Sequence, residues 1–289
     1  MFISRYLQVI RFKIFALIAL TLLMECTNPV DDNASGGRFT FAVADVGQGL
    51  AQFGVAGKRA AAFDVGGNYA AWRGAYSSLG SPRIESIMIS HTESDHCGAL
   101  QSFGASLDWS GEIVVSIYED TAKLRESSPA WANRITFKTC ARGDTLRPLG
   151  RAVTVICLWP PPDLDKTQFS GEWKNHYGLV FSIRHGDARA LVTSDIDNAA
   201  MTEIAAQSRY DLRSQILSVP HHGSAGSVNP LFFSYVEPEV AVISCSINNN
   251  YGHPSPKMVE ELQRHAGIIK YTYVDGTIAF GSNRYYWNY

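Results

Sequence analysis

The chain has 289 residues, of which 46% are hydrophobic, 18% are charged and 11% are aromatic. This composition excludes a disordered or fibrous protein, and the length is sufficient for one large domain or two small ones with a core that needs no disulfide bonds. The formal net charge of −2 argues against a protein that binds DNA or an anionic membrane through its overall charge.

Residues 1–26 have the pattern of an export signal. Basic residues precede an unbroken apolar run over residues 14–24, which is too short for a comfortable membrane-spanning helix. Leu23 lies three residues before Cys26, as in a bacterial lipoprotein signal, although Glu25 stands where a small residue is expected. We therefore predict a lipoprotein-type signal with lipidation at Cys26. A soluble exported protein and an uncleaved membrane anchor are the alternatives.

Residues 27–37 are rich in Asn, Asp, Ser and Gly, which predicts a flexible tether. The chain is accordingly expected in the bacterial cell envelope, either anchored to the membrane through its N-terminal lipid or signal, or periplasmic. No protein partner is predicted. The spacing of the remaining cysteines contains no CxxC element and does not reveal a pairing. These cysteines are Cys97, Cys140, Cys157 and Cys245.

Residues 38–289 are predicted to form the folded domain. Hydrophobic patterns predict strands over 38–47, 50–55, 59–67, 83–90, 112–118, 152–162, 177–186, 189–195, 214–220 and 239–246. Helices are predicted over 119–128, 198–208 and 255–267, and a closing hairpin over 268–280 with an Asp-Gly turn. Because helices recur between groups of strands, we expect an α/β fold with two packed sheets and helices outside.

The segment SHTESDHCGAL, residues 90–100, places four ligand-type side chains directly after a predicted buried strand. An extended segment points His91, Glu93 and Asp95 to one side, and a helix that begins nearby turns His96 back toward them. Imidazole and carboxylate are ligands of zinc, and carboxylates also suit manganese. The segment therefore predicts a metal site; a solvated cluster with a helix-capping aspartate is the alternative.

Three later segments offer matching side chains. LVTSDID ends a strand in Asp195, which can bridge two metal ions or cap a helix. VPHHGS ends a strand in His221 and His222, of which at least one is a predicted ligand, and His221 is favoured because it stands nearer the strand end. NNNYGHPSP offers His253 just before a helix N-terminus, where free backbone N–H groups can hold an anion; a turn histidine is the alternative.

Together with DVGQG, FDVGG and WPPP…NHYGLVF, these motifs occur in the order seen in the metallo-β-lactamase superfamily. Over residues 38–289 the chain resembles the hydrolase domain of ComEC-type DNA-uptake proteins. The resemblance implies a four-layer αββα sandwich, with two mixed sheets and outer helices. It also implies two divalent metal ions, zinc or manganese, at the common edge of the sheets.

The resemblance also implies a role for each residue. His91 and Glu93 match the first metal position, Asp95 and His96 match the second, and Asp195 matches the bridging aspartate. The His221–His222 pair matches the last histidine motif. Two further acids, Asp45 and Asp64, match groups near the site that orient ligand imidazoles or support the structure.

Two positions depart from the superfamily pattern. Glu93 stands where relatives carry His or, in ComEC-type proteins, Asp. The third histidine position falls on Asn175, a poorer ligand, with His176 beside it as a second candidate for metal or substrate contact. The first metal is therefore expected to bind weakly or to need His176. A first site rich in carboxylates favours manganese over obligatory zinc.

Two metal ions would supply a hydroxide near neutral pH and stabilise a phosphate or ester oxygen. We therefore predict an exported metal-dependent hydrolase that acts on a phosphodiester of a nucleic acid or an envelope component, with nuclease activity as a narrower form. Asp95 and Asp195 are the predicted catalytic acids, with His253 as catalytic helper and Ser224 as substrate contact. The alternative is a surface-anchored binding protein with a degenerate site, which Glu93 and Asn175 favour.

Overall fold

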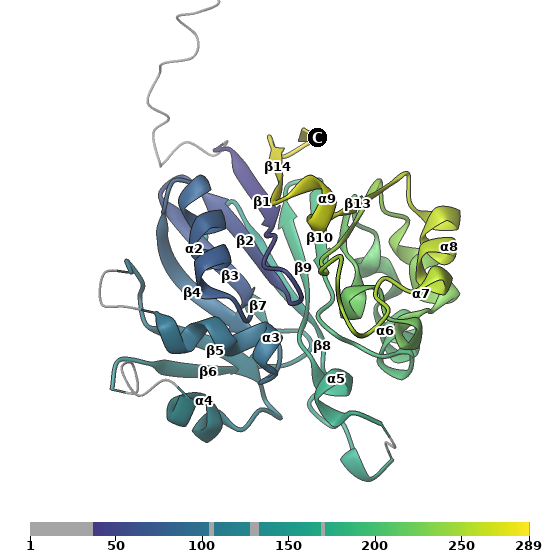
Figure 1. The fold of residues 1–289 in the computed structure, drawn as a ribbon, viewed down its shortest axis with the longest axis horizontal. Helices are drawn as coiled ribbons and strands as arrows, with labels where there is room; N and C mark the ends of the chain where they lie inside the picture. The colour runs from purple at the N-terminus through teal and green to yellow at the C-terminus, as the bar shows by residue number, and fades with distance from the viewer. Residues whose placement is uncertain (1–36, 104–106, 128–132, 169–170, 289) are drawn as a thin grey trace, which may run out of the picture. The chain divides into compact units, whose positions relative to one another are not determined.

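Two β-sheets face one another in the centre of the folded region, and helices cover the outer face of each (Figure 1). The computed structural model describes residues 37–288 except 104–106, 128–132 and 169–170. The predicted signal, Cys26 and residues 27–36 of the predicted tether lie outside the described residues. Contacts group Arg38–Tyr289 into one unit. None of the helices in the described part of the chain is both long and apolar enough to cross a membrane.

The first sheet has eight strands in the order β15-β14-β1-β2-β3-β4-β5-β6. The β1–β2 and β2–β3 pairs are antiparallel, whereas the β3–β4, β4–β5 and β5–β6 pairs are parallel, so the sheet is mixed. The strands are β1 (Phe39–Val43), β2 (Ala51–Ala56), β3 (Arg59–Val65), β4 (Arg83–Ile89), β5 (Glu112–Ser116), β6 (Thr136–Cys140), β14 (Ile278–Ser282) and β15 (Trp287–Asn288).

The second sheet has seven strands in the order β13-β12-β11-β10-β9-β8-β7. Strands β10 to β13 run parallel and β7 to β10 are antiparallel. The strands are β7 (Thr145–Leu146), β8 (Thr154–Trp159), β9 (Val180–His185), β10 (Ala188–Val192), β11 (Ile216–Ser218), β12 (Val240–Ile243) and β13 (Ile268–Tyr271).

Three apolar clusters hold the four layers together. The central cluster lies between the sheets and includes Phe63 of β3 and Phe181 of β9, whose rings meet edge to face at 5.7 Å. A second cluster packs α2 (Tyr69–Ser78) and the 3₁₀ helix η1 (Gly98–Ser102) on the first sheet, and a third packs α6 (Asn198–Leu212), α7 (Pro230–Val236) and α8 (Pro256–His265) on the second sheet. Burial of these apolar side chains is the main force that holds the sheets and helices together. The predicted αββα sandwich is confirmed.

The helices begin and end as follows: α2 (Tyr69–Ser78), α3 (Ser94–Cys97), η1 (Gly98–Ser102), α4 (Thr121–Ser127), η2 (Lys166–Gln168), α5 (Trp173–Tyr177), α6 (Asn198–Leu212), η3 (Pro220–Gly223), η4 (Ala225–Ser227), α7 (Pro230–Val236), α8 (Pro256–His265) and α9 (Thr272–Asp275). Helix α8 begins as the sequence predicted, with Ser255 as N-cap and Pro256 in the first turn.

The predicted hairpin over 268–280 is wrong. Strand β13 pairs with β12 in the second sheet, whereas β14 pairs with β1 in the first. The Asp-Gly pair ends the one-turn helix α9, where Gly276 has φ +70° and its N–H donates to the Thr272 carbonyl. Helix α9 therefore carries the chain from one sheet to the other, and each strand finds an existing sheet edge instead of its neighbour in sequence.

Helix α2 was not predicted from the sequence. Its N-cap is Asn68, whose side-chain oxygen accepts a hydrogen bond from the Ala71 N–H at 3.1 Å. Trp72 and Tyr76, one turn apart, are buried and pack on Phe53 of β2. The cap and this four-residue spacing are helix signals that the dense small residues of the segment obscured.

Candidate metal centre

Ligand-type side chains follow the ends of strands in both sheets. In the first sheet, His91 comes two residues after β4 ends. In the second sheet, Asp195 follows β10, and the His221–His222 pair follows β11. Backbone hydrogen bonds fix these segments together, since the Leu179 N–H donates to the Ser90 carbonyl and the His221 N–H donates to the Ser194 carbonyl.

Two overlapping groups of side chains lie close enough to hold a metal ion. His91, His96 and Asp195 each present a ligand atom within 4.8 Å of the others, and so do Asp95, His96 and His222. His96 Nε2 lies 3.2 Å from Asp195 Oδ1, and His222 Nε2 lies 3.5 Å from both Asp95 Oδ2 and Asp195 Oδ2. The ligand-type residues of segment 91–96 therefore meet Asp195 and His222, which lie about 100 residues or more further along the sequence.

Several polar atoms of this cluster are buried without a hydrogen-bond partner among the described residues. They are His91 Nε2, His96 Nε2, His222 Nε2 and Asp195 Oδ1. An unpaired buried polar atom costs about 1–3 kcal/mol, so four that converge on one place need a further binding partner. Nitrogen and carboxylate donors around one point are the ligands of zinc and manganese. The residues present therefore fit a divalent metal ion.

The opposite nitrogen of each imidazole is hydrogen-bonded, which fixes the direction of the ring. His96 Nδ1 lies 2.8 Å from Asp64 Oδ2, and His222 Nδ1 donates to the Ser244 carbonyl at 2.8 Å. His91 Nδ1 lies 3.0 Å from the Ser90 hydroxyl, which itself donates to Asp64. A metal-binding histidine commonly uses its second nitrogen in this way, which leaves Nε2 for the ion.

The carboxylates favour the protonated form of two imidazoles. Burial lowers the pKa of His96, but the nearby Asp195 and Asp64 carboxylates outweigh it and raise that pKa well above its ordinary value. The pKa of His222 is also raised, because Asp195 and Asp95 outweigh burial. Burial opposes ionisation of Asp195, yet His96 and His222 hold its pKa well below the usual range. An arriving cation would displace the Nε2 protons.

Strained backbone accompanies the cluster. Asp64, Ser194, His221 and His222 have φ between +50° and +54°, in the left-handed region that non-glycine residues rarely adopt. Each of these residues either belongs to the cluster or contacts it. Such strain persists where surrounding contacts impose it, and it concentrates at functional sites.

The structure favours His222 over His221 within the histidine pair. His222 is buried, whereas the His221 side chain is 27% exposed and its Nε2 lies 3.6 Å from Asp195 Oδ2. His221 belongs to neither three-residue group. Proximity to the strand end therefore does not select the inner residue, because the left-handed turn points His222 inward. Glu93 is also peripheral: its side chain is 39% exposed and its Oε2 lies 3.7 Å from His91 Nε2.

Asn175 and His176 take different directions on α5. Asn175 is buried, and its side-chain oxygen has no hydrogen-bond partner in the described part of the chain. The His176 Nδ1 lies 3.2 Å from the carboxylate of Asp197, the N-cap of α6, and its ring stacks on Trp173. The expectation that His176 helps the first metal has no support in these contacts.

The two predicted outer acids also differ. Asp64 contacts His96 directly, as described above. Asp45 accepts a hydrogen bond from the Gly47 N–H, within its own turn. That turn approaches the cluster through Gly49, where a Cβ would lie 2.6 Å from the Asp95 carbonyl oxygen, and through Leu50, whose N–H donates to the same carbonyl. The DVGQG segment thus positions Asp95 with its backbone.

His253 and Ser224 lie near the histidine pair with different environments. The His253 ring is 5.6 Å from the His221 ring and 6.2 Å from the His222 ring. Burial and these two histidines lower the pKa of His253 to about 4, so its imidazole is neutral at pH 7. The exposed Tyr251 stacks on its other side. The Ser224 hydroxyl accepts a hydrogen bond from the Gly226 N–H.

Several residues that support the site were not predicted. Ser90 and Ser244 hold the imidazoles of His91 and His222. Glu119 accepts hydrogen bonds from Thr92 and from the Tyr177 hydroxyl, which ties the first ligand segment to α5. Ser90 precedes the first ligand in sequence, so its position offered a signal. Ser244 and Glu119 come from distant segments and offered none.

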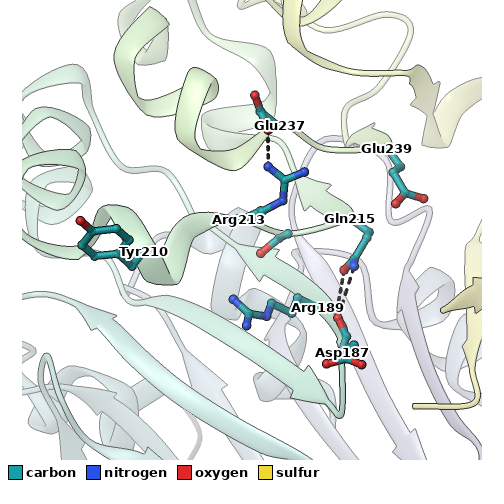
Figure 2. A pocket seen from close by; sticks show the side chains of 8 residues that line it. Asp187, Arg189, Tyr210, Arg213, Gln215, Glu237 and Glu239 are labelled. Carbon is teal, nitrogen blue, oxygen red and sulfur yellow. Dashed lines mark hydrogen bonds and ion pairs between the residues drawn. The ribbon is translucent and has the colours of Figure 1, made fainter. Parts of the chain in front are cut away.

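A separate cavity of about 310 Å³ lies at the opposite ends of β10 to β12 (Figure 2). Its walls carry side chains of both charges, and two of these already form an ion pair. Arg213 forms an ion pair with Glu237, and the Gln215 amide donates to the Asp187 carbonyl. The cavity contains none of the candidate metal ligands.

Comparison with solved structures identifies the fold. YhfI of Bacillus subtilis, a metallo-β-lactamase fold protein, is 10% identical and superimposes with a TM-score of 0.55, covering 85% of this chain and 100% of YhfI. Tm1679, a metal-dependent hydrolase of the β-lactamase superfamily, is 12% identical with a TM-score of 0.53, covering 83% of this chain and 98% of Tm1679. The chain therefore has the metallo-β-lactamase fold, with buried His and Asp clusters that suit a metal ion.

Sequence relatives narrow this class. Competence protein ComA of Neisseria gonorrhoeae is 29% identical over 246 residues, which are 83% of this chain and 32% of ComA. The chain is a distant homologue of ComEC-type competence proteins, as its motifs predicted. It spans only 25% to 32% of the length of the curated relatives that it matches. No family model matches the chain.

Proposed function

We propose that the chain is a metal-dependent hydrolase of the metallo-β-lactamase superfamily that acts on a phosphodiester. The observation that carries this proposal is the convergence of four buried, unpaired ligand atoms from both sheets. The fold that the chain shares with Tm1679 supports it.

The candidate ligands divide between two ions when each imidazole serves one of them. His96 belongs to both groups, but its single free nitrogen can bind only one ion. With His96 assigned to the second ion, that ion takes Asp95, His96 and His222. The first would be held by His91 with Glu93, and Asp195, which lies near both His91 and His96, would be available to either ion. The first ion then has one imidazole and two carboxylates, a set that suits manganese as well as zinc.

The protein's own groups prepare the site for an ester. The bound ions would polarise the ester oxygen and lower the pKa of a water molecule. Asp64, Ser90 and Ser244 hold the imidazoles in place, so the donor atoms need little reorganisation. Neutral His253, beside the histidine pair, can donate one hydrogen bond to a substrate oxygen and stabilise charge that develops there.

A phosphodiester is favoured over other esters because its charged non-bridging oxygens match a centre that holds two cations. The nearby Lys174, whose ammonium group donates to the Thr92 carbonyl, adds positive charge beside Glu93. The candidate metal ligands themselves include no Lys or Arg. A short nucleotide or an envelope phosphodiester therefore fits the proposal better than a long DNA duplex, which needs many basic contacts.

The test is a panel of metals against substrates. The purified full chain would be stripped with a chelator, reloaded with zinc or manganese, and assayed on bis-p-nitrophenyl phosphate and on single- and double-stranded DNA. We expect turnover that requires added metal and is lost in the His96→Ala variant. No metal-dependent turnover on any substrate would contradict the proposal and favour a binding protein with a degenerate site. Turnover that persists in His96→Ala would contradict the residue assignment.

We also propose that the chain is exported and anchored to the membrane through Cys26. The basic and apolar pattern of residues 1–26 supports this, as does the position of Leu23 before Cys26. Metabolic labelling with a fatty-acid analogue in a bacterial host should label the natural chain and not the Cys26→Ser variant. Equal labelling of both chains would contradict lipidation at this residue.

A further inference from the structure

Two cysteines from opposite sheets meet in the central core. Cys140 is the last residue of β6 in the first sheet, and Cys157 lies within β8 of the second. Both are fully buried and belong to the cluster between the sheets. The Cys157 thiol lies 3.1 Å from the Trp159 carbonyl oxygen, and Cys140 is close enough to influence the pKa of that thiol.

The backbone holds the two cysteines in this position. The turn that follows Cys140 pairs with β8 on both sides of Cys157, since the Gly143 N–H donates to the Cys157 carbonyl and the Cys157 N–H donates to the Asp144 carbonyl. Both distances are 2.9 Å. These backbone bonds hold the turn after Cys140 against Cys157, so the two cysteines approach each other from opposite sheets, as a cross-link requires.

The other described cysteines have no such neighbour. Cys97 packs against the apolar cluster outside the first sheet, and Cys245 lies in the cluster outside the second. Each sheet separates one of them from the central cluster. Among the described residues, the Cys140–Cys157 pair alone combines two thiols in one core cluster.

We propose that Cys140 and Cys157 form a disulfide bond that joins the two sheets when the chain folds in the presence of a disulfide donor. One thiolate attacks the donor, releases one donor thiol and forms a mixed disulfide. The second thiolate then attacks the protein sulfur and releases the second donor thiol. Two protein thiols are oxidised, one donor disulfide is reduced, and the two protons pass to the released thiolates.

The reaction belongs to folding and not to the finished structure. Both sulfurs are sealed in the core, and burial together with the neighbouring Cys140 raises the pKa of the Cys157 thiol well above its ordinary value. Little thiolate therefore exists once the core has closed, and a donor cannot reach it. The exchange takes place while the sheets assemble, and the closed core then protects the bond from reductants.

The experiment refolds the denatured full chain with a mixture of oxidised and reduced glutathione. The product is then denatured without reductant, alkylated and mapped by mass spectrometry. We expect the Cys140 and Cys157 peptides to be linked and lighter by two hydrogens than the separate thiol peptides. The Cys97→Ser/Cys245→Ser variant should keep this link, and the Cys140→Ser variant should leave Cys157 alkylated. Alkylation of both residues in the natural chain, or their linkage to other cysteines, would overturn the proposal.

A stability measurement adds an independent readout. Closing a loop of this size raises the melting temperature of a domain of this length by roughly 6–12 °C. The oxidised chain should therefore melt at a higher temperature than the same chain refolded with reductant, and Cys140→Ser should remove the difference. A linked chain that melts no higher than the reduced chain would contradict a bond in the native geometry.

Discussion

Strands β10 to β12 gather charged side chains at both of their ends, but the two groups differ in how they are satisfied. At one end, around the cavity of Figure 2, Arg213 pairs with Glu237 and Gln215 holds the Asp187 backbone. At the other end, His96, His222 and Asp195 are buried, and their ligand atoms converge on one place without a well-formed hydrogen bond. Charge alone does not mark a site; buried ligand atoms that converge and shift one another's pKa do.

The two strand ends also differ in how their charged side chains are stabilised. Exposed pairs gain little energy, because water already solvates both partners. The buried cluster of imidazoles and carboxylates needs the rest of the fold to hold its geometry, as the left-handed residues Asp64, Ser194 and His222 show. The fold therefore stabilises an arrangement that a bound cation would complete.

The strongest test of the difference between the two strand ends removes Asp195, the central carboxylate of the buried cluster. The Asp195→Ala variant should lose metal binding and metal-dependent turnover by more than about 100-fold, because Asp195 faces His96 and His222. Metal content after dialysis and turnover of bis-p-nitrophenyl phosphate measure the effect. Circular dichroism should show the same fold as the natural chain. Full metal content in the variant would break the comparison.

The histidine pair offers a sharper test within the same turn. His222→Ala should lower zinc affinity by about 100-fold, whereas the partly exposed His221 should matter less, by about ten-fold at most when changed to Ala. Calorimetric titration of the metal-free chain with zinc gives both affinities. If His221→Ala proved the more damaging change, the outer histidine would be the ligand.

The next largest effect is expected at Asp64, which contacts the candidate ligand His96 but is not itself a candidate ligand. Asp64→Asn should reduce zinc affinity by about 10–100-fold, because it weakens the hold on His96 Nδ1. Asp45→Asn is the matched control, since this carboxylate bonds only within its own turn among the described contacts. Equal losses in both variants would mean that the effect comes from folding and not from the orientation of His96.

The smallest effect is expected at the other end of the strands. Arg213→Ala removes an ion pair whose side chains are 73% and 52% exposed, so the free energy of unfolding should fall by at most about 1 kcal/mol. Chemical denaturation measures this change. Zinc affinity should stay the same, and a clear loss of affinity would show that the two ends are coupled.

The sequence predicted the layered fold and most members of the cluster because both depend on local signals. Alternating apolar residues mark the strands, and ligand-type residues directly after them mark the sheet edge. The sequence did not reveal which histidine of the pair points inward, because that depends on a left-handed turn. It also missed Ser244, which lies 22 positions after His222 and reaches it only through the sheet order.

The prediction of a hairpin over 268–280 was also wrong because the true pairing depends on distant segments. An Asp-Gly pair is a strong local signal, but the partner of each flanking strand was already set by distant edges. Strand β13 completes one sheet and β14 completes the other, so the competition was decided by long-range pairing. No pattern within residues 268–280 could show this.

The pairing of β14 with β1 has a consequence for synthesis of the chain. The register joins Phe39 to Ser282 and Val43 to Ile278, so the first described strand lies beside one of the last. While the ribosome is still making the intervening residues, β1 has only β2 as a partner, and its outer edge remains open to wrong contacts. The first sheet can close only after translation has passed Ser282, so the outer edge of β1 stays uncovered while all the strands between β2 and β14 are made.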